Sequence, residues 1–235
     1  MKVADFSEGV HVPQGKNSWI AVNLDESLKT TGFSKVSVVK HCIPSFESCR
    51  NRNTRSSFSK KQSRKSMNLE QLKAIQAPIK EKYRTEPNSA MVTIRSHGIV
   101  DVNQQHCTIR SHSGTIRAGL HPSAGGTPDD ACSAELLLES LVACAGVTFS
   151  AVATNMGIEI LACRIEAEGD MDFRGTLGVD RAAPVGLTGI RLKFQMESDA
   201  DIATLDKLVS LTERYCVIYQ TLIKGIPIAT QRVSN

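Results

Sequence analysis

The chain has 235 residues, and 41% of them are hydrophobic, which is enough for a substantial core. Its net charge of +4 is unevenly placed: residues 1–66 hold twelve Lys and Arg against five Asp and Glu, whereas residues 67–235 hold sixteen against nineteen. No apolar run approaches the roughly 18 residues that span a bilayer, and the N-terminus lacks a signal-peptide pattern, so neither a membrane protein nor a secreted protein is expected. The seven cysteines form no CxxC pair and are odd in number, which favours reduced thiols in the cytoplasm.

Residues 1–66 are predicted to be a disordered basic extension. The stretch CRNRNTRSSFSKKQSRKS (49–66) has seven basic residues and no acidic ones, a composition that cannot build a core. It could be a solvated tail, or a segment that binds nucleic acid or a membrane surface. A third interpretation is an over-long gene prediction, with Met67 as the true start. The folded domain is expected over residues 67–235.

The first predicted elements of this domain are a helix and a hairpin. MNLEQLKAIQAPIKEKYRTEP places Leu and Ile on one side of an amphipathic helix, which Pro78 could divide. AMVTIRSHGIV and QQHCTIRSHSGTIRAGL alternate as strands do, with turn signals at His97–Gly98 and Ser113–Gly114. The loop HPSAGGTPDD follows, and its Asp129 and Asp130 are expected to cap the next helix.

Two long helices and two strands follow. Residues 133–157 predict the first helix, which ends at a glycine. IEILACRIEAEGDMDF and LTGIRLKFQME predict the strands, and DADIATLDKLVSLTERYCVIYQTLIKG predicts a second long helix with an aspartate cap. IPIATQRV is expected to be a last short strand. This order predicts an α+β fold, an antiparallel sheet with two long central helices.

Each predicted long helix has a cysteine deep within it, Cys144 and Cys216. Ser140 and Thr148 lie four residues before and after Cys144, so a small polar stripe crosses an otherwise apolar helix. A buried free cysteine usually serves as a small hydrophobic residue, and that interpretation stands beside a reactive one. If the helices pack together, the two sulfurs could lie within disulfide reach, a distance that the sequence does not give.

Two motifs resemble the OsmC/Ohr superfamily, the osmotically inducible protein C and organic hydroperoxide resistance proteins. AELLLESLVACAGVT, with its lead-in AGGTPDD, is similar to the first family signature, and ERYCVIYQTL is similar to the second. The two motifs stand in the family's order, and the resemblance covers residues 67–235. It implies an OsmC-like fold and an intertwined homodimer.

The resemblance also implies a cysteine-based peroxidase of the oxidative stress response that reduces organic hydroperoxides or hydrogen peroxide. Cys144 would become a sulfenic acid, Cys216 would resolve it as a disulfide, and a dithiol such as a lipoyl group would restore both thiols. A free thiol is only about 3% ionised at pH 7, so the attacking thiolate needs stabilisation. The family supplies an arginine, for which Arg95 is the first candidate, Arg117 the second and Arg110 the third.

The chain departs from the peroxidase pattern at the carboxylate that holds this arginine. Peroxidase members have a glutamate ten residues before the cysteine, where this chain has Ala134. Glu135 is the candidate in its place, although a separation of nine residues turns it away from Cys144. Ser133 and Val217 stand where the family has prolines. These differences indicate a divergent OsmC-like branch, for which catalysis is favoured but not fixed.

Two other functions remain open. One is a non-catalytic OsmC-like protein that holds a small ligand in the same apolar cleft, and the other is a nucleic-acid-associated protein that uses the basic extension. Cys132, near a helix N-terminus, is a rival reactive thiol. The chain has no zinc-ligand spacing and no GxGxxG, GxSxG or P-loop motif, so neither a metal nor a cofactor is expected. The preferred hypothesis needs a peroxide, a dithiol reductant and a second copy as partners, and neither nucleic acid nor a membrane.

Overall fold

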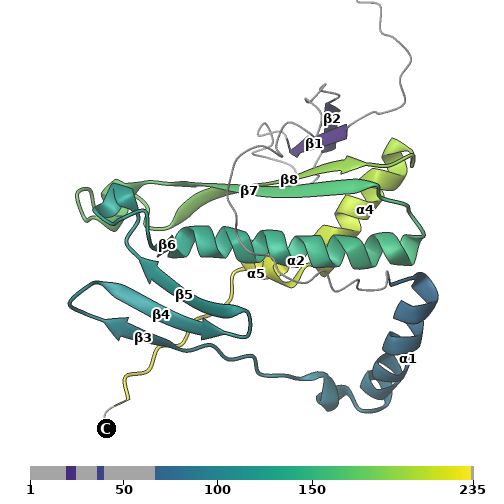
Figure 1. Cartoon of the computed structure of the whole chain (residues 1–235), viewed down its shortest axis with the longest axis horizontal. Helices are drawn as coiled ribbons and strands as arrows, with labels where there is room; N and C mark the ends of the chain where they lie inside the picture. Colours follow the sequence, from purple (N-terminus) through teal and green to yellow (C-terminus); the bar gives the residue numbers. More distant parts are fainter. Residues whose placement is uncertain (1–19, 25–35, 40–66, 234–235) are drawn as a thin grey trace, which may run out of the picture.

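The computed structural model describes residues 20–24, 36–39 and 67–233, which form a mixed α+β fold with two four-stranded sheets (Figure 1). The first sheet has the order β2 (Val36–Val39), β1 (Ile20–Leu24), β8 (Leu187–Glu197) and β7 (Ala162–Met171), and it is antiparallel throughout. The second has the order β3 (Gly98–Asp101), β4 (His106–Ser111), β5 (Gly114–Gly119) and β6 (Ala131–Cys132), with only the last pair parallel. The predicted fold class is confirmed.

Part of the N-terminal segment is strand rather than irregular chain. β1 pairs with β2 along one edge and with β8 along the other, where Ala21 lies opposite Gln195. The rest of residues 1–66, including the basic stretch 49–66, lies outside the described residues. The extension and the alternative start at Met67 therefore stay predictions.

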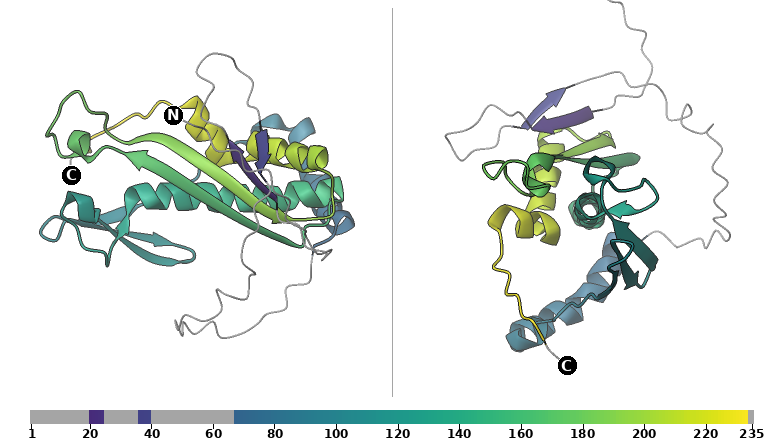
Figure 2. Two further views of the ribbon diagram at one scale, coloured as in Figure 1. Left: turned by 90° about the horizontal axis from the view of Figure 1, so that it is seen from above. Right: turned by 90° about the vertical axis from the view of Figure 1, so that its left-hand side faces the viewer.

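Helix α2 (Ser133–Met156) lies at the centre of the fold, beneath the β7–β8 hairpin (Figures 1 and 2). Residues four apart share one side of a helix, and the buried residues of α2 follow this spacing. They are Leu141, Ala145, Phe149 and Ala153. Phe149 stacks on Phe194 of β8 with 5.8 Å between ring centroids, so this ridge of α2 is the side that meets the sheet. As predicted, α2 ends at Gly157, which has a φ of 68°.

By length and composition alone, α2 could cross a membrane, with a mean hydropathy of 1.9 over its most apolar window. The expectation that no segment is apolar enough is therefore wrong. One such helix is weak evidence for a membrane, because a central core helix passes the same test. Here α2 packs against β7 and against the helices α4 (Ile202–Tyr215) and α5 (Val217–Lys224), and 28% of its apolar window is buried within the described structure.

The remainder of the core comes from β8 and α4. Alternate residues of β8 point inward, because side chains of a strand alternate between its two faces. The buried residues of β8 are Leu192, Phe194 and Met196, and those of α4 are Leu205, Leu208, Val209 and Thr212. Cys216, just after α4, belongs to the same cluster. The core thus extends from the sheet, around α2, to the point where α4 ends.

The predicted second long helix is two helices. α4 begins at Ile202 and is capped by Asp201, whose carboxylate accepts the Thr204 N–H at 2.8 Å, and α5 begins at Val217. Between them, Cys216 has φ −73° and ψ 111°, an extended conformation. Its N–H still donates to the Thr212 carbonyl at 2.9 Å and closes the last turn of α4. The prediction of one continuous helix is wrong, because the helical spacing of apolar residues continues across a break of a single residue.

The first half of the described domain also differs from the predicted hairpin. Residues 91–97 are irregular, and β3 begins only at Gly98, so the predicted turn at His97–Gly98 is wrong. The turn lies at residues 102–105, whereas the predicted turn at Ser113–Gly114 is confirmed by the pairing of β4 with β5. Residues 226–233, a predicted strand, have no regular structure. Both misplaced stretches have a strand-like composition, and strand formation depends on a neighbour to pair with.

Helix α1 (Leu69–Thr85) is continuous through Pro78, which does not divide it. Its N-terminus is a capping box: the Asn68 side chain accepts the Gln71 N–H at 2.9 Å, and the Gln71 side chain accepts the Asn68 N–H at 3.1 Å. None of its side chains is buried. α1 is therefore held mainly by local bonds and not by the core.

Asp130 does not cap α2, contrary to the prediction. The residue before the helix is Cys132, which makes no side-chain capping bond. The Asp130 carboxylate is 3% exposed and pairs with Nε2 of His106 at 2.6 Å and with Arg117. It lies over Gly119, where a Cβ would come within 2.7 Å of its Oδ2. A buried carboxylate with two basic partners thus ties the loop before α2 to β4 and β5.

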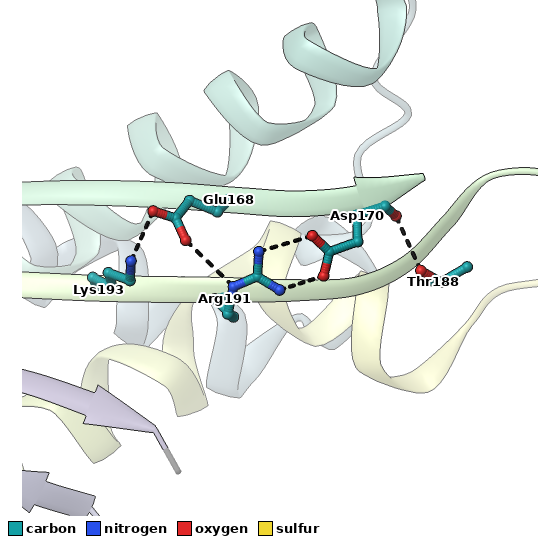
Figure 3. A network of polar contacts seen from close by, with 5 residues as sticks. All are labelled: Glu168, Asp170, Thr188, Arg191 and Lys193. Carbon is teal, nitrogen blue, oxygen red and sulfur yellow. Dashed lines mark hydrogen bonds and ion pairs between the residues drawn. The ribbon is translucent and has the colours of Figure 1, made fainter. Parts of the chain in front are cut away.

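The face of the β7–β8 hairpin opposite to the buried side chains of β8 carries a network of ion pairs (Figure 3). Arg191 donates to Glu168 and Asp170, Lys193 donates to Glu168 at 2.7 Å, and the Thr188 hydroxyl donates to the Asp170 carbonyl at 3.2 Å. Lys193, followed by Arg191, lowers the pKa of Glu168, and Arg191 lowers the pKa of Asp170. Exposed ion pairs of this kind add little to stability. The network marks this face as the solvated side of the sheet.

Candidate active site

Cys144 and Cys216, singled out in the sequence, lie together where α2 meets the break between α4 and α5. Cys216 is fully buried, Cys144 is half-buried, and both are free thiols. The Cys216 side chain is a hydrogen-bond partner of Cys144. The packing of two neighbouring helices therefore brings together two sulfurs that are 72 residues apart in the chain.

The Cys144 sulfur is surrounded by hydrogen-bond donors. Burial raises the pKa of this thiol, but four donors outweigh burial and leave the pKa below its ordinary value. The donors are the Ile218 N–H, the Cys216 thiol, the Val217 N–H and the Thr148 hydroxyl. Each stabilises the negative charge of a thiolate more than it stabilises a neutral thiol. Thr148 belongs to the small polar stripe that the sequence predicted on α2.

The break at Cys216 creates the two backbone donors. Because Cys216 leaves the helical conformation, Val217 and Ile218 form the first turn of α5. The N–H groups in the first turn of a helix have no carbonyl partner within that helix, and they form the positive end of its dipole. Such an end is a ready site for an anion. The start of α5 therefore gives Cys144 the stabilisation that the sequence analysis expected from an arginine.

The two thiols have pKa values shifted in opposite directions. Burial raises the pKa of Cys216; the Tyr219 N–H offsets part of this effect, and the neighbouring Cys144 raises the pKa further. Cys144 therefore ionises first, while Cys216 stays protonated and donates to it. This arrangement suits attack by Cys144, followed by exchange with Cys216 as the second thiol.

The structure does not bring Arg95 or Glu135 to this site. Arg95 is exposed in the irregular segment before β3, and not on a strand as predicted. Glu135 is exposed in the first turn of α2, about 13.5 Å along the helix axis from Cys144 at 1.5 Å per residue. Arg117 is paired with Asp130, and Arg110 is exposed at the end of β4. Within the described ranges, no guanidinium is among the groups that shift the pKa of Cys144.

A cavity of about 350 Å³ lies between α2 and β7. It is lined by Phe149 and Ala153 of α2 and by Ile165 and Cys163 of β7. Ala153 is nine residues, or two and a half turns, after Cys144, so the cavity is on the other side of α2 from the paired cysteines. Withdrawal of the Cys163 thiol from water raises its pKa to about 11. This cysteine is therefore a neutral thiol at physiological pH.

The other two cysteines within the described ranges, Cys107 and Cys132, show no comparable surroundings. Cys132, the rival thiol, precedes α2 without a side-chain capping bond, and Cys107 packs beside Gly98, where a Cβ would come within 2.7 Å of its sulfur. Cys42 and Cys49 lie outside the described residues. In residues 20–24, 36–39 and 67–233, no group of three or more His, Cys, Asp or Glu could hold a metal ion.

Sequence reasoning missed the backbone donors of Val217 and Ile218 and the residues that support them from α4 and α5. One signal was present, however. Proline is favoured at the first position of a helix, and Val217 stands where the family motif has proline. That correspondence predicts a new helix start directly after Cys216. The chain lacks the proline itself, so its composition gives no sign of the break.

Comparisons with known proteins agree with the predicted resemblance. Residues 126–231, just under half of the chain, match the family model for OsmC-like protein. No curated protein matches the chain significantly in sequence. Among solved structures, an OsmC-like protein from Mycoplasma pneumoniae has 18% identity and a TM-score of 0.48, with 57% of this chain and 89% of that chain covered. An organic hydroperoxide resistance protein from Elizabethkingia anophelis has 13% identity and a TM-score of 0.42, covering 57% and 91%. OhrB of Bacillus subtilis has 20% identity and a TM-score of 0.38, covering 58% and 93%.

Proposed function

Because residues 126–231 belong to the OsmC/Ohr superfamily, we propose that the chain is a thiol peroxidase that reduces organic hydroperoxides or hydrogen peroxide. The observation that carries this proposal is the pairing of two unlike thiols. Cys144, with a lowered pKa, lies against the buried and protonated Cys216. A thiolate next to a second thiol is the arrangement that two-step cysteine oxidation requires.

In the first step, the Cys144 thiolate attacks one oxygen of the peroxide. An S–O bond forms, the O–O bond breaks, and the sulfur is oxidised by two electrons to a sulfenic acid. The alkoxide takes up a proton and leaves as an alcohol, or as water when the substrate is hydrogen peroxide. The N–H groups of Val217 and Ile218 and the hydroxyl of Thr148 hold the sulfur as a thiolate before this step.

In the second step, Cys216 resolves the sulfenic acid. Its sulfur forms an S–S bond with Cys144, the S–O bond breaks, and hydroxide leaves with the Cys216 proton as water. The two side chains are already partners in the reduced protein, which favours disulfide formation between them. A dithiol reductant then returns both residues to thiols by thiol–disulfide exchange. Roles for Arg95 and Glu135 remain predictions, and Arg95→Ala and Glu135→Ala are their direct tests.

Thiol counting tests the peroxidase. One equivalent of cumene hydroperoxide should remove two free thiols per reduced parent chain and none from Cys144→Ser. Cys216→Ser should lose one thiol and form a dimedone adduct on Cys144, because its sulfenic acid cannot be resolved. Cys163→Ser is the matched control and should lose two, as the parent does. A parent chain that keeps all its thiols would overturn the proposal.

A second candidate is a binding protein for a small apolar ligand. The observation in its favour is the cavity between α2 and β7, which is separate from the paired cysteines. In that case the thiols are incidental, and the parent chain should lose no thiols to peroxide. It should instead gain thermal stability with an apolar ligand, because a ligand that binds only the folded state raises the free energy of unfolding.

We further propose that the protein is a cytoplasmic homodimer. Several large apolar side chains of residues 91–97, of β3, of the turn after β3 and of residues 226–233 are more than 60% exposed. They are Met91, Ile94, Ile99, Val102 and Ile228. Extended apolar surface beside a strand edge that no described residue pairs with is typical of an interface. Light scattering should give twice the chain mass of 25.5 kDa, and the chain mass itself would contradict the proposal.

A further inference from the structure

The helix break at Cys216 leaves a carbonyl in need of a donor. In a continuous helix, each N–H donates to the carbonyl four residues earlier, so the Val217 N–H would donate to the Glu213 carbonyl. Here the Val217 N–H is directed to Cys144. The Glu213 carbonyl instead accepts from Nε2 of Gln220 at 2.9 Å, in a part-buried position. The side chain of Gln220 thus replaces the missing backbone donor.

This replacement decides which partner the Val217 N–H has. A carbonyl that is partly withdrawn from water and has no donor is destabilising, so a conformation that supplies a donor is favoured. Without the Gln220 amide, the simplest repair is to restore the helical bond from Val217 to Glu213. That repair would withdraw a donor from Cys144 and straighten the junction between α4 and α5. With the Gln220 amide in place, the Glu213 carbonyl already has a donor, so the helical bond from Val217 does not need to re-form.

A second contact holds Glu213. The Tyr219 hydroxyl donates to the Glu213 carboxylate. Backbone N–H groups at the start of α5, those of Tyr219 and Ile218, are also partners of the Cys216 thiol. Glu213 is therefore held through its carbonyl by Gln220 and through its carboxylate by Tyr219, both from α5. These two bonds bridge the break on both sides of Cys216.

We propose that Gln220 is a positioning residue of the active site, which holds the α4–α5 break in the form that presents the Val217 and Ile218 N–H groups to Cys144. It does not touch the peroxide; it acts through the backbone of α5. The inference deepens the proposed peroxidase, since it concerns the reactivity of the attacking thiol. It can nevertheless be tested on the reduced protein without any peroxide.

The test is the alkylation rate of Cys144 by iodoacetamide, followed by peptide-resolved mass spectrometry on the reduced full chain. In Gln220→Met, which keeps the length but lacks the N–H, the rate at pH 7 should fall about five- to tenfold, because each unit of pKa changes the thiolate fraction about tenfold. In Gln220→Lys, which keeps an N–H donor, it should stay at or above the parent rate. Gln71→Met removes the hydrogen bond that the Gln71 side chain accepts in the capping box of α1, and it should leave the alkylation rate of Cys144 unchanged. An unchanged rate in Gln220→Met, or an equal fall in Gln220→Lys, would overturn the proposal.

Side-chain amide exchange in the unmodified protein gives a measurement that does not depend on a variant folding. The Gln220 amide donates to a carbonyl, whereas Gln71 uses its oxygen as an acceptor. We expect slower hydrogen exchange for the amide protons of Gln220 than for those of Gln71, and equal exchange would contradict the inference. The thiol count with peroxide is independent of these measurements. If the chain loses no thiols to peroxide but Gln220→Met still slows the alkylation of Cys144, only the proposed peroxidase is overturned.

Discussion

The thiols of Cys144 and Cys163 lie on opposite sides of the same helix and show what controls thiol ionisation in this fold. Both are partly withdrawn from water, and withdrawal from water raises the pKa of each. Around Cys144, four hydrogen-bond donors reverse this effect, and the pKa is lowered. At Cys163, beside the cavity between α2 and β7, nothing offsets it, and the pKa rises to about 11. The opposite directions of the two pKa shifts therefore reflect the donors around Cys144, which Cys163 lacks.

Cys216 extends this comparison. It also receives backbone N–H groups, yet its pKa is raised, because it is buried and lies beside Cys144. Two neighbouring thiols cannot both ionise easily, since like charges oppose each other. The start of α5 thus serves one sulfur strongly and leaves the other protonated. A single helix break thereby produces the asymmetry that a two-cysteine mechanism needs.

The largest predicted effect is a direct test of the difference in pKa between Cys144 and Cys163. At pH 7, iodoacetamide should modify Cys144 about a hundredfold or more faster than Cys163, because only the thiolate reacts and each unit of pKa is worth about tenfold. As pH rises, the alkylation rate of Cys144 should reach its plateau at a pH below the ordinary pKa of a thiol. The rate of Cys163 should keep rising to about pH 11. Peptide-resolved mass spectrometry measures both rates in one sample.

Unfolding supplies the control for this experiment. In urea, both cysteines lose their surroundings, so their rates should converge. A contrast that persists in urea would show that local sequence, and not the fold, sets the two rates. Similar rates in the folded protein would contradict the comparison.

The sequence predicted those parts of the fold in which one periodic pattern decides the structure. α2 was predicted from an unbroken helical pattern that ends at Gly157, and β8 from an alternating pattern that matches its bounds. The two cysteine motifs predicted the sulfurs that the structure brings together. In each case the signal is local, because neighbouring residues in the sequence carry it.

The parts that could not be predicted depend on contacts between distant residues. The break at Cys216 has neither glycine nor proline to mark it, and it is satisfied by Gln220 from the next turn. Asp130 has the spacing of a helix cap but pairs instead with side chains of β4 and β5. Arg95 was expected on a strand, and its segment has no neighbour to pair with in the described part of the chain. Sequence spacing gives the candidates, whereas tertiary packing selects among them.

A smaller effect should separate reactivity from stability at the start of α5. Val217→Pro removes one N–H from Cys144, so the alkylation rate of Cys144 should fall about threefold to fivefold. The fold should tolerate proline here, because Val217 is the first helical residue and Cys216, before it, is already extended. Its side chain is 68% exposed, so little packing is lost. We expect a melting temperature equal to or above that of the parent; a lower rate together with a much lower melting temperature would point to misfolding instead.

The smallest effect concerns the one side-chain donor on α2. Thr148→Val keeps the shape of the side chain but removes the hydroxyl, the weakest of the four groups that favour the Cys144 thiolate. We expect the alkylation rate of Cys144 to fall by about twofold, because a weaker donor shifts the pKa by only a fraction of a unit. Thr154→Val is the matched control: its hydroxyl donates to the Ser150 carbonyl on the cavity side of α2, so the rate should not change. If both variants alter the rate equally, the effect comes from the stability of the helix, and the donors around Cys144 lose their special role. If only Thr148→Val lowers the rate, then the hydroxyl of Thr148 itself stabilises the Cys144 thiolate, even though it is the weakest of the four donors.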